Sequence, residues 1–137
     1  ILFDELSAFS KQTIATTEDG SLGEKGFVTG PLKRLLDDPA TKPDAVYAVG
    51  PVPMMRAVSD MTRPYGVKTI VSLNPIMIDG TGMCGGCRVT VGGKVQFACV
   101  DGPEFDGHDV DYAELAARQN AYQELDEHGC RLDAALA

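Results

Sequence analysis

Residues 79–87 read Asp-Gly-Thr-Gly-Met-Cys-Gly-Gly-Cys, and a further cysteine follows at Cys99. Two β-branched runs lie between them, at residues 88–91 and 94–98. They flank Gly92-Gly93, and a two-residue glycine connection between such runs is typical of a β-hairpin. The hairpin brings Cys99 back beside the glycine-rich loop. This stretch therefore predicts a small Gly- and Cys-rich module built from a loop and a hairpin.

The module offers four candidate metal ligands: Asp79, Cys84, Cys87 and Cys99. Plant-type [2Fe–2S] proteins use Cys-x4-Cys-x2-Cys and a distant fourth Cys, and here an aspartate takes the first position. A glycine-rich loop lets the backbone wrap closely and point amide N–H groups at the sulfurs. A carboxylate can close the shell with an oxygen, which is a harder ligand than thiolate. The spacing predicts a [2Fe–2S] cluster whose two irons differ electronically.

Other interpretations of the cysteines stay open at this point. A structural zinc ion accepts Cys-x2-Cys with two further ligands, so Cys84, Cys87 and Cys99 with Asp79 or Cys130 could supply one. Zinc knuckles usually pair two such units, and this chain has one Cys-x2-Cys. The thiols could also be unligated. Cys130 stands apart from the cluster and is otherwise an ordinary thiol at a helix end.

Upstream of the module, strand-like and helix-like segments alternate. Residues 12–17, 45–49 and 67–73 are short β-branched or apolar runs, and residues 31–36 and 54–61 carry apolar side chains at helical spacing. Strands separated by helices imply parallel pairing with right-handed crossovers. The nearly continuous apolar run at 45–49 suits a strand buried on both faces. The fold class expected is α/β, with a partial parallel sheet followed by the Gly/Cys-rich module.

Two loops after predicted strands are candidate nucleotide-binding segments. Gly50-Pro51 follows a strand and opens a helix, where the missing Cβ permits close approach by a flat ring or a pyrophosphate. Polar residues at 17–21 follow an earlier strand, where hydroxyls and carboxylates commonly hold ribose. Merely structural turns are the alternative for both loops, and the spacing of the methionines makes core positions their simpler interpretation. The candidate cofactor-binding residues are Thr17, Asp19, Gly20, Ser21, Gly50, Pro51, Met54 and Met55.

Composition narrows the class of protein. The chain has 137 residues, of which 44% are hydrophobic, and its net charge is −8. The apolar fraction excludes a disordered tail, and the acidic balance argues against a nucleic-acid partner. No run approaches a membrane span and no leader is visible, so the expected location is cytoplasmic, without a membrane partner.

The expected organisation has three parts. Residues 1–73 form part of a nucleotide-binding domain, 74–111 form the cluster module, and 112–137 form a helix to about residue 127 with a short tail. The first six residues read like the end of a helix already under way. We therefore expect preceding β-α units in a longer polypeptide, and a fragment without them could homodimerise through exposed apolar surface.

The motifs resemble a known family. They are Gly-Pro-x-x-Met-Met, residues 74–89 around the cysteine loop, and Phe-Ala-Cys-Val-Asp-Gly-Pro-Glu-Phe-Asp-Gly-His at 97–108. Over residues 12 to 118 the chain is similar to the C-terminal part of ferredoxin–NADP reductase-like electron-transfer flavoproteins. The similarity is closest to the small subunits of NADH-dependent reduced ferredoxin:NADP oxidoreductases, also called sulfide dehydrogenase subunits. Electron-transfer subunits of dihydroorotate dehydrogenase are near relatives.

The resemblance implies an oxidoreductase subunit that is inactive as an isolated fragment. It implies NAD(H) contact by residues 17–21 and Gly50-Pro51, cluster ligation by the three clustered cysteines, and FAD bound mainly outside this stretch. Electrons would pass through the cluster to a larger glutamate synthase-like flavoprotein subunit, and ferredoxin would be reached through that complex. Asp79 fits the bifurcating branch, whereas the dihydroorotate dehydrogenase branch has Cys there. The alternatives are an electron-transfer subunit of dihydroorotate dehydrogenase or of a hydrogenase, and a zinc-stabilised structural or docking module.

Residues just past Cys99 are expected either to border the cluster or to face the partner subunit. They are Asp101, Glu104, Phe105, Asp106 and His108. The alternative for His108 is a solvated loop position.

Overall fold

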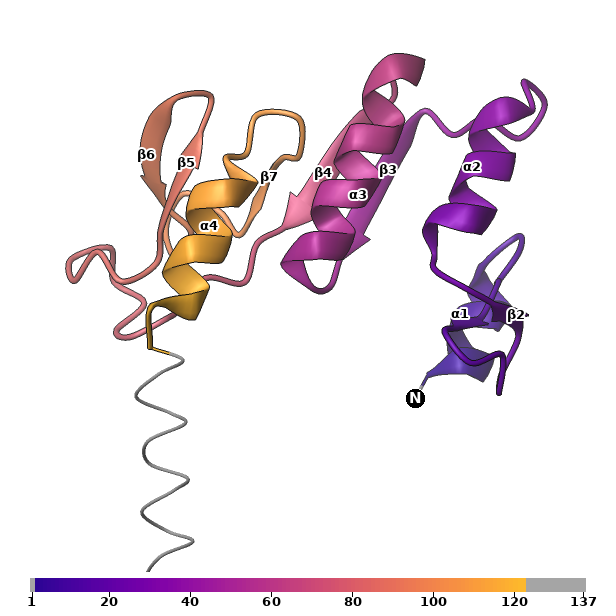
Figure 1. The fold of residues 1–137 in the computed structure, drawn as a ribbon, viewed down its shortest axis with the longest axis horizontal. Coiled ribbons are helices and arrows are strands. Elements are labelled where there is room, and N and C mark those ends of the chain that lie inside the picture. The colour runs from indigo at the N-terminus through magenta and orange to yellow at the C-terminus, as the bar shows by residue number, and fades with distance from the viewer. Residues whose placement is uncertain (1, 123–137) are drawn as a thin grey trace, which may run out of the picture. The chain divides into compact units, whose positions relative to one another are not determined.

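The computed structural model describes residues 2–122 (Figure 1). It divides into two compact units, one ending at Pro43 and one beginning at Asp44, and each is described by itself. The first unit contains α1 (Phe3–Phe9), β1 (Thr16–Thr17), β2 (Glu24–Lys25) and α2 (Thr29–Asp37). α2 confirms the helix predicted over residues 31–36.

The strand predicted at 12–17 does not join the sheet of the second unit, so that prediction was wrong. Of residues 12–17, only Thr16–Thr17 form a strand (β1), and this strand pairs in parallel with β2. The chain turns back because Asp19 Oδ1 accepts a hydrogen bond from the Ser21 N–H at 2.9 Å. Gly23 then passes so close to residue 15 that an added Cβ would lie 2.2 Å from the Ala15 carbonyl oxygen. The local turn therefore provides a partner strand within the first unit.

The second unit is built on a three-stranded sheet of β3 (Ala45–Val49), β4 (Lys68–Ser72) and β7 (Glu104–Asp106). β3 and β4 are parallel, as predicted, with Val49 opposite Ser72. The crossover between them is α3 (Val52–Thr62), followed by a 3₁₀ turn (Arg63–Tyr65). β7 pairs with β4 in the antiparallel sense, which the sequence did not predict.

β3 is covered on one face only, which corrects the prediction of a strand buried on both faces. α3 packs on the sheet, with Met55 and Val71 completely buried and Ala48 4% exposed. Tyr47 and Val49 alternate with Ala48 and point to the opposite face, where they are 69% and 73% exposed. The described residues of this unit leave that face uncovered.

A buried polar network ties α3 to the sheet and to the following segment. Thr62 Oγ1 hydrogen-bonds the Thr69 hydroxyl and lies 3.0 Å from His108 Nε2. The Ser59 hydroxyl donates to the Met55 carbonyl at 2.9 Å and lies 2.8 Å from the Tyr112 hydroxyl. Because these buried groups satisfy one another, they fix the approach of the chain that follows β7.

The remaining elements are β5 (Arg88–Val91), β6 (Lys94–Phe97) and α4 (Tyr112–Gln119). β5 and β6 pair antiparallel across Gly92-Gly93, whose φ angles of 59° and 72° suit a tight hairpin turn. α4 begins at the Asp111 cap, whose Oδ1 accepts from the N–H groups of residues 113 and 114.

A 3₁₀ turn (Asn120–Tyr122) follows α4. The predicted continuation of this helix to about residue 127, together with Gly129 and Cys130, lies outside the described residues. Within the described part of the chain, no helix has the length and apolar character needed to cross a membrane.

Candidate metal centre

The cysteine-bearing segment between β4 and β7 is a long excursion from the sheet. Backbone hydrogen bonds join its two ends, and we call this junction the neck. The excursion leaves the end of β4 and returns at β7, where Ser72 pairs with Glu104 and the Leu73 N–H donates to the Pro103 carbonyl at 2.9 Å. Ser72 is also opposite Val49, the last residue of β3. The excursion and the Gly50-Pro51 turn therefore start from the same edge of the sheet.

Asp79 and Cys84 form one pair of candidate ligands. The pKa of Asp79 is lowered, first by the Thr81 N–H, which donates to Oδ1 at 2.9 Å, and further by hydrogen bonds from the Cys84 thiol and backbone. Both side chains are exposed. The carboxylate is thus held in its charged form next to a sulfur, as a ligand oxygen must be.

Cys87 and Cys99 form the second pair. The pKa of Cys99 is raised, first by a hydrogen bond shared with Cys87 and then by burial, while the Gly82 N–H acts in the opposite direction. Cys87 is 2% exposed. The hairpin accounts for this contact because its two strands pair Arg88 with Phe97, two residues before Cys99.

The four candidate ligands lie in two pairs. In the described part of the chain, no three His, Cys, Asp or Glu side chains form a group that could hold a metal ion. Cys84, Cys87 and Cys99 are free thiols. A [2Fe–2S] cluster takes two protein ligands on each iron, whereas structural zinc requires four ligands on one ion.

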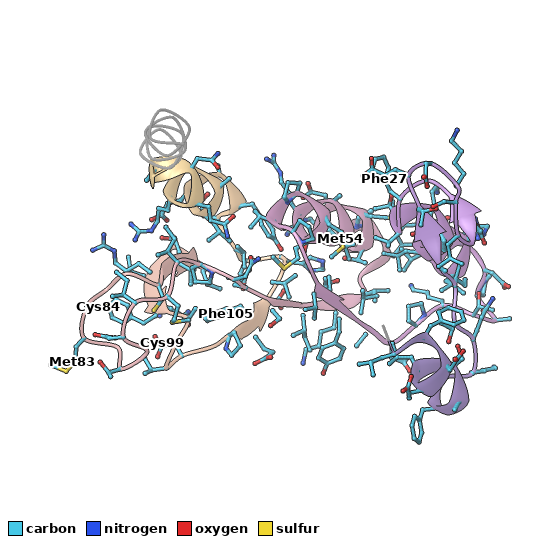
Figure 2. The ribbon with its side chains drawn as sticks, turned by 90° about the horizontal axis from the view of Figure 1, so that it is seen from below. Phe27, Met54, Met83, Cys84, Cys99 and Phe105 are labelled. Carbon is cyan, nitrogen blue, oxygen red and sulfur yellow. The ribbon has the colours of Figure 1, made fainter. Side chains whose placement is uncertain are left out.

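Glycines allow the loop to pass close to the sulfurs. Gly82 has φ of 80°, and an added Cβ there would meet Val100 at 3.0 Å. The Gly86 N–H donates to Cys84 Sγ at 3.4 Å. Backbone N–H groups at Gly82 and Gly86 therefore already point at two of the candidate ligand sulfurs, which is the kind of contact that tunes a cluster potential. Figure 2 shows Cys84 and Cys99 near the loop tip, where the Met83 side chain points away from the protein.

Side chains at the end of α4 hold this loop, a feature that the sequence analysis missed. Arg118 Nη2 donates to the Gly86 carbonyl at 3.1 Å, and Gln119 Nε2 donates to the Asn74 carbonyl at 2.8 Å. A helix ending in Arg and Gln carries no signal for such contacts, because the acceptors are backbone carbonyls more than 30 positions away.

The candidate nucleotide-binding residues that follow β3 differ in how far they are buried. Gly50 lies against Met54, since an added Cβ would be 2.9 Å from the Met54 Cε. Pro51 is exposed at the start of α3, whose first turn has no side-chain cap. Met55 is completely buried because α3 turns it into the core, which fits the core position predicted from the methionine spacing, and its assignment as a cofactor-binding residue stays a prediction.

The remaining nucleotide candidates lie in the first unit. Thr17 Oγ1 donates to the Leu22 carbonyl at 3.0 Å and accepts from the Leu22 N–H. The pKa of Asp19 is lowered by its hydrogen bonds from Ser21. Asp19, Gly20 and Ser21 are exposed. The loop is thus a preformed polar turn whose carboxylate and hydroxyl groups hydrogen-bond within the loop.

Several residues past Cys99 have contacts within the second unit, and the role expected for them beside the cluster or a partner subunit stays a prediction. Asp101 Oδ2 accepts from the Phe97 N–H at 2.7 Å, and Phe105 is 7% exposed on β7. His108 is neither solvated nor directed at the ligands, because its Nε2 bonds Thr62 and its carbonyl accepts from Arg63 at 2.6 Å.

Comparison with known proteins agrees with this geometry. The family model for the iron–sulfur cluster binding domain of dihydroorotate dehydrogenase B matches residues 74–111. A Clostridium beijerinckii protein encoded in the adh 3′ region is 51% identical over 120 residues, covering 88% of this chain and 40% of the relative. A Thermotoga maritima homologue of the dihydroorotate dehydrogenase B (NAD(+)) electron transfer subunit is 49% identical over 127 residues, covering 93% of this chain and 44% of the relative.

A solved structure shows the same similarity in three dimensions. It is a chain of NADH-dependent reduced ferredoxin–NADP oxidoreductase, solved in work on flavin-based electron bifurcation. It is 44% identical with a TM-score of 0.81, covering 98% of this chain and 48% of that one. The chain thus spans less than half the length of the relatives it matches. Residues 74–111 thus match an iron–sulfur cluster binding domain, and over most of its length the chain is similar to dihydroorotate dehydrogenase B electron-transfer subunits and to the solved oxidoreductase chain, whose mixed α/β, ferredoxin reductase-like fold it shares.

Proposed function

We propose that this chain is part of an electron-transfer subunit of an NAD(P)H-dependent flavoprotein oxidoreductase, of the NADH-dependent ferredoxin:NADP oxidoreductase type. Asp79 and Cys84 would hold one iron of a [2Fe–2S] cluster, and Cys87 and Cys99 would hold the other. The observation that carries the proposal is this grouping of the ligands into two pairs on a loop matched by an iron–sulfur domain.

A bound cluster would supply one-electron transfer between a two-electron donor and a further acceptor. The chain's own residues would orient it and set its polarity. The carboxylate of Asp79 would give one iron a harder ligand than the thiolates that would hold the other iron. The N–H groups of Gly82 and Gly86 place positive dipoles against the sulfurs of Cys99 and Cys84.

The position of the excursion supports electron exchange with a nicotinamide or flavin. Both the neck at Leu73 and the Gly50-Pro51 turn lie at the carboxyl edge of β3 and β4, where ligands of open parallel sheets bind. In our proposal, NAD(H) contacts Gly50, Pro51 and Met54 in the second unit, and the loop Thr17–Ser21 is the separate candidate NAD(H)-binding segment of the first unit. FAD is held mainly by parts of the protein that this chain does not include.

The acceptor in this proposal is a larger glutamate synthase-like flavoprotein subunit, through which ferredoxin is reached. Cys84 is exposed, and Met83 beside it is 87% exposed, so this edge of the cluster site is open to a docked protein. Asp79 in place of cysteine supports this branch over dihydroorotate dehydrogenase. Flavin-based electron bifurcation was studied in the solved relative, and the same activity for this protein is part of the proposal.

The direct test is metal analysis of the anaerobically purified full-length protein. We expect about two irons and two sulfides per chain, and an EPR signal on reduction with NADH in the presence of FAD. A colourless protein with one zinc per chain would contradict the proposal and favour a structural docking module. Cluster reduction by dithionite but not by NADH would contradict only the proposed electron donor.

A second variant tests Asp79 as a ligand. Asp79→Cys should keep the cluster with a shifted potential, because thiolate is a softer ligand than carboxylate. Asp79→Ala should lower iron content or change the EPR spectrum. If both variants match the unmodified protein in spectrum and potential, Asp79 is not a ligand and the fourth must be sought elsewhere, with Cys130 the first to examine.

A further inference from the structure

The end of α4 is positioned rigidly over the ligand loop. Asp111 caps the helix, and Leu115 anchors its inner face at 2% exposure. Arg118 follows Leu115 by three positions, so the two side chains lie on the same face. The half-buried guanidinium of Arg118 donates to the Gly86 carbonyl at 3.1 Å. Gln119, the next residue, donates to the Asn74 carbonyl.

Gly86 is the residue through which this contact reaches the candidate ligands. It stands between Cys84 and Cys87, and its N–H donates to Cys84 Sγ while its carbonyl accepts from Arg118. An added Cβ at Gly86 would lie 2.8 Å from the Ile78 Cδ1, so the turn is also packed from the other side. A displacement of this residue would therefore move a ligand sulfur.

The charge of Arg118 lies beside the ligand loop, together with that of Arg88, which lines the same cavity. The chain has a net charge of −8, and a cluster with four anionic ligands becomes more negative when it accepts an electron. Arg118 borders a cavity of about 190 Å³ whose walls include Ile76, Ile78 and Leu115. The half-buried position of Arg118 limits screening by water, so a positive charge here acts more strongly than one at the open surface.

We infer that Arg118 is a positioning residue for the cluster, holding the Cys84–Cys87 turn through the Gly86 carbonyl, and that its charge stabilises the reduced form. This inference rests on the proposed function, since it requires a cluster on this loop. It assigns to α4 a part in setting the reduction potential, in addition to its packing on β5.

The test is a redox titration, followed by EPR, of the anaerobic full-length protein and matched variants. Arg118→Gln removes the charge and keeps a hydrogen-bond donor, whereas Arg118→Lys keeps the charge. Gln119→Ala removes the neighbouring loop contact without a charge change. Arg56→Gln removes the same charge from an exposed position on α3, where Arg56 pairs with Asp60 at 3.8 Å.

In Arg118→Gln, the ratio of reduced to oxidised cluster at a fixed ambient potential should fall about tenfold, equivalent to about 59 mV for a one-electron couple. Arg118→Lys, Gln119→Ala and Arg56→Gln should stay within about threefold of the unmodified protein. An Arg118→Gln protein that contains its cluster and titrates like the unmodified protein would overturn the inference. So would an equal shift in Arg118→Lys or Arg56→Gln.

If Arg118→Gln does not retain iron, Arg118→His provides the same comparison within one protein, since its charge is switched by pH near 6.5. Its potential should rise on acidification by more than that of the unmodified protein, and equal pH dependence would overturn the inference. Absence of a cluster from the unmodified protein contradicts the proposed function instead, so the two failures are distinguishable.

Discussion

The sheet and the ligand loop of the second unit are stabilised in different ways. We call β3, β4, β7 and α3 the framework, and residues 74–87 the ligand loop. The framework has fully buried side chains such as Met55 and Val71 and a satisfied polar network at Thr62. The ligand loop is mostly exposed and is held largely by side-chain hydrogen bonds from outside it.

The framework and the ligand loop therefore depend on different interactions for a defined structure. Packing fixes the framework whether or not a metal is bound, because its contacts are complete within the polypeptide. The ligand loop contributes few buried groups of its own, so its geometry depends on anchors at its ends and on the metal that its ligands share. Changes in the two regions should therefore affect different measurements.

The largest expected effect is loss of the cluster from the ligand side. Cys99→Ala should reduce iron from about two per chain to near zero, while far-ultraviolet circular dichroism of the framework stays close to that of the unmodified protein. Cys130→Ala is the matched cysteine control and should retain the iron. Retention of a normal cluster in Cys99→Ala would remove this residue from the ligand set.

Glycine substitutions compare the regions by stability. At Gly107, an added Cβ would lie 2.4 Å from Ser59 Oγ and 2.9 Å from Val71 Cγ1, so Gly107→Ala should cost about 2–3 kcal/mol. At Gly80, the space is open and only the φ of 74° opposes a side chain, so Gly80→Ala should cost about 1 kcal/mol. Urea unfolding of the cluster-free protein measures the loss of unfolding free energy in both variants. Equal losses would contradict the distinction between a packed framework and a loosely packed ligand loop.

The polar network can be tested at its centre. Thr62→Val keeps the shape but removes the hydroxyl that bonds Thr69 and His108, and should cost about 1–2 kcal/mol in urea unfolding. Thr81→Ala is the control in the ligand loop, because it removes an exposed hydroxyl and keeps the Thr81 backbone N–H that donates to Asp79. The control should leave the unfolding midpoint within experimental error.

The smallest effect is expected at Tyr112 and depends on pH. Burial raises the pKa of Tyr112 above its ordinary value of 10.0, so the folded state retains the proton longer than the unfolded state. The resulting stability is present below pH 10 and is lost as pH rises through the folded pKa. Tyr112→Phe should cost about 1 kcal/mol at neutral pH and should lose less stability than the unmodified protein above pH 10. Parallel losses of stability in the two proteins would show that Tyr112 is not the group responsible.

Sequence patterns predicted the parts of the fold with local signals. Residues 45–49 and 67–73 were recognised as parallel strands because Gly50-Pro51 and Gly66 punctuate them, and the helix between them has apolar side chains at regular spacing. β7 was missed because it has three residues and a single apolar side chain, Phe105. Its position depends on pairing with β4, which no local pattern encodes.

The candidate ligands could be predicted from the spacing of residues along the chain. The contacts that hold the ligand loop in place could not. Cysteine and aspartate separations indicate which side chains can share a cluster, but the Arg118 contact joins a helix side chain to a carbonyl that any residue has. Met55 has a local signal for burial, since the helical spacing of the methionines predicted a core position and its side chain is completely buried.

The hydrogen bond between Leu73 and Pro103 has a consequence for how such proteins can evolve. Because Ser72 and Glu104 are already paired as antiparallel neighbours, a tight turn could connect them and complete an ordinary β-hairpin. The whole cysteine-bearing excursion is thus an insertion whose two ends are paired with each other in the sheet. A lineage could gain, lose or exchange an electron carrier at this position without re-registering the strands on which it stands.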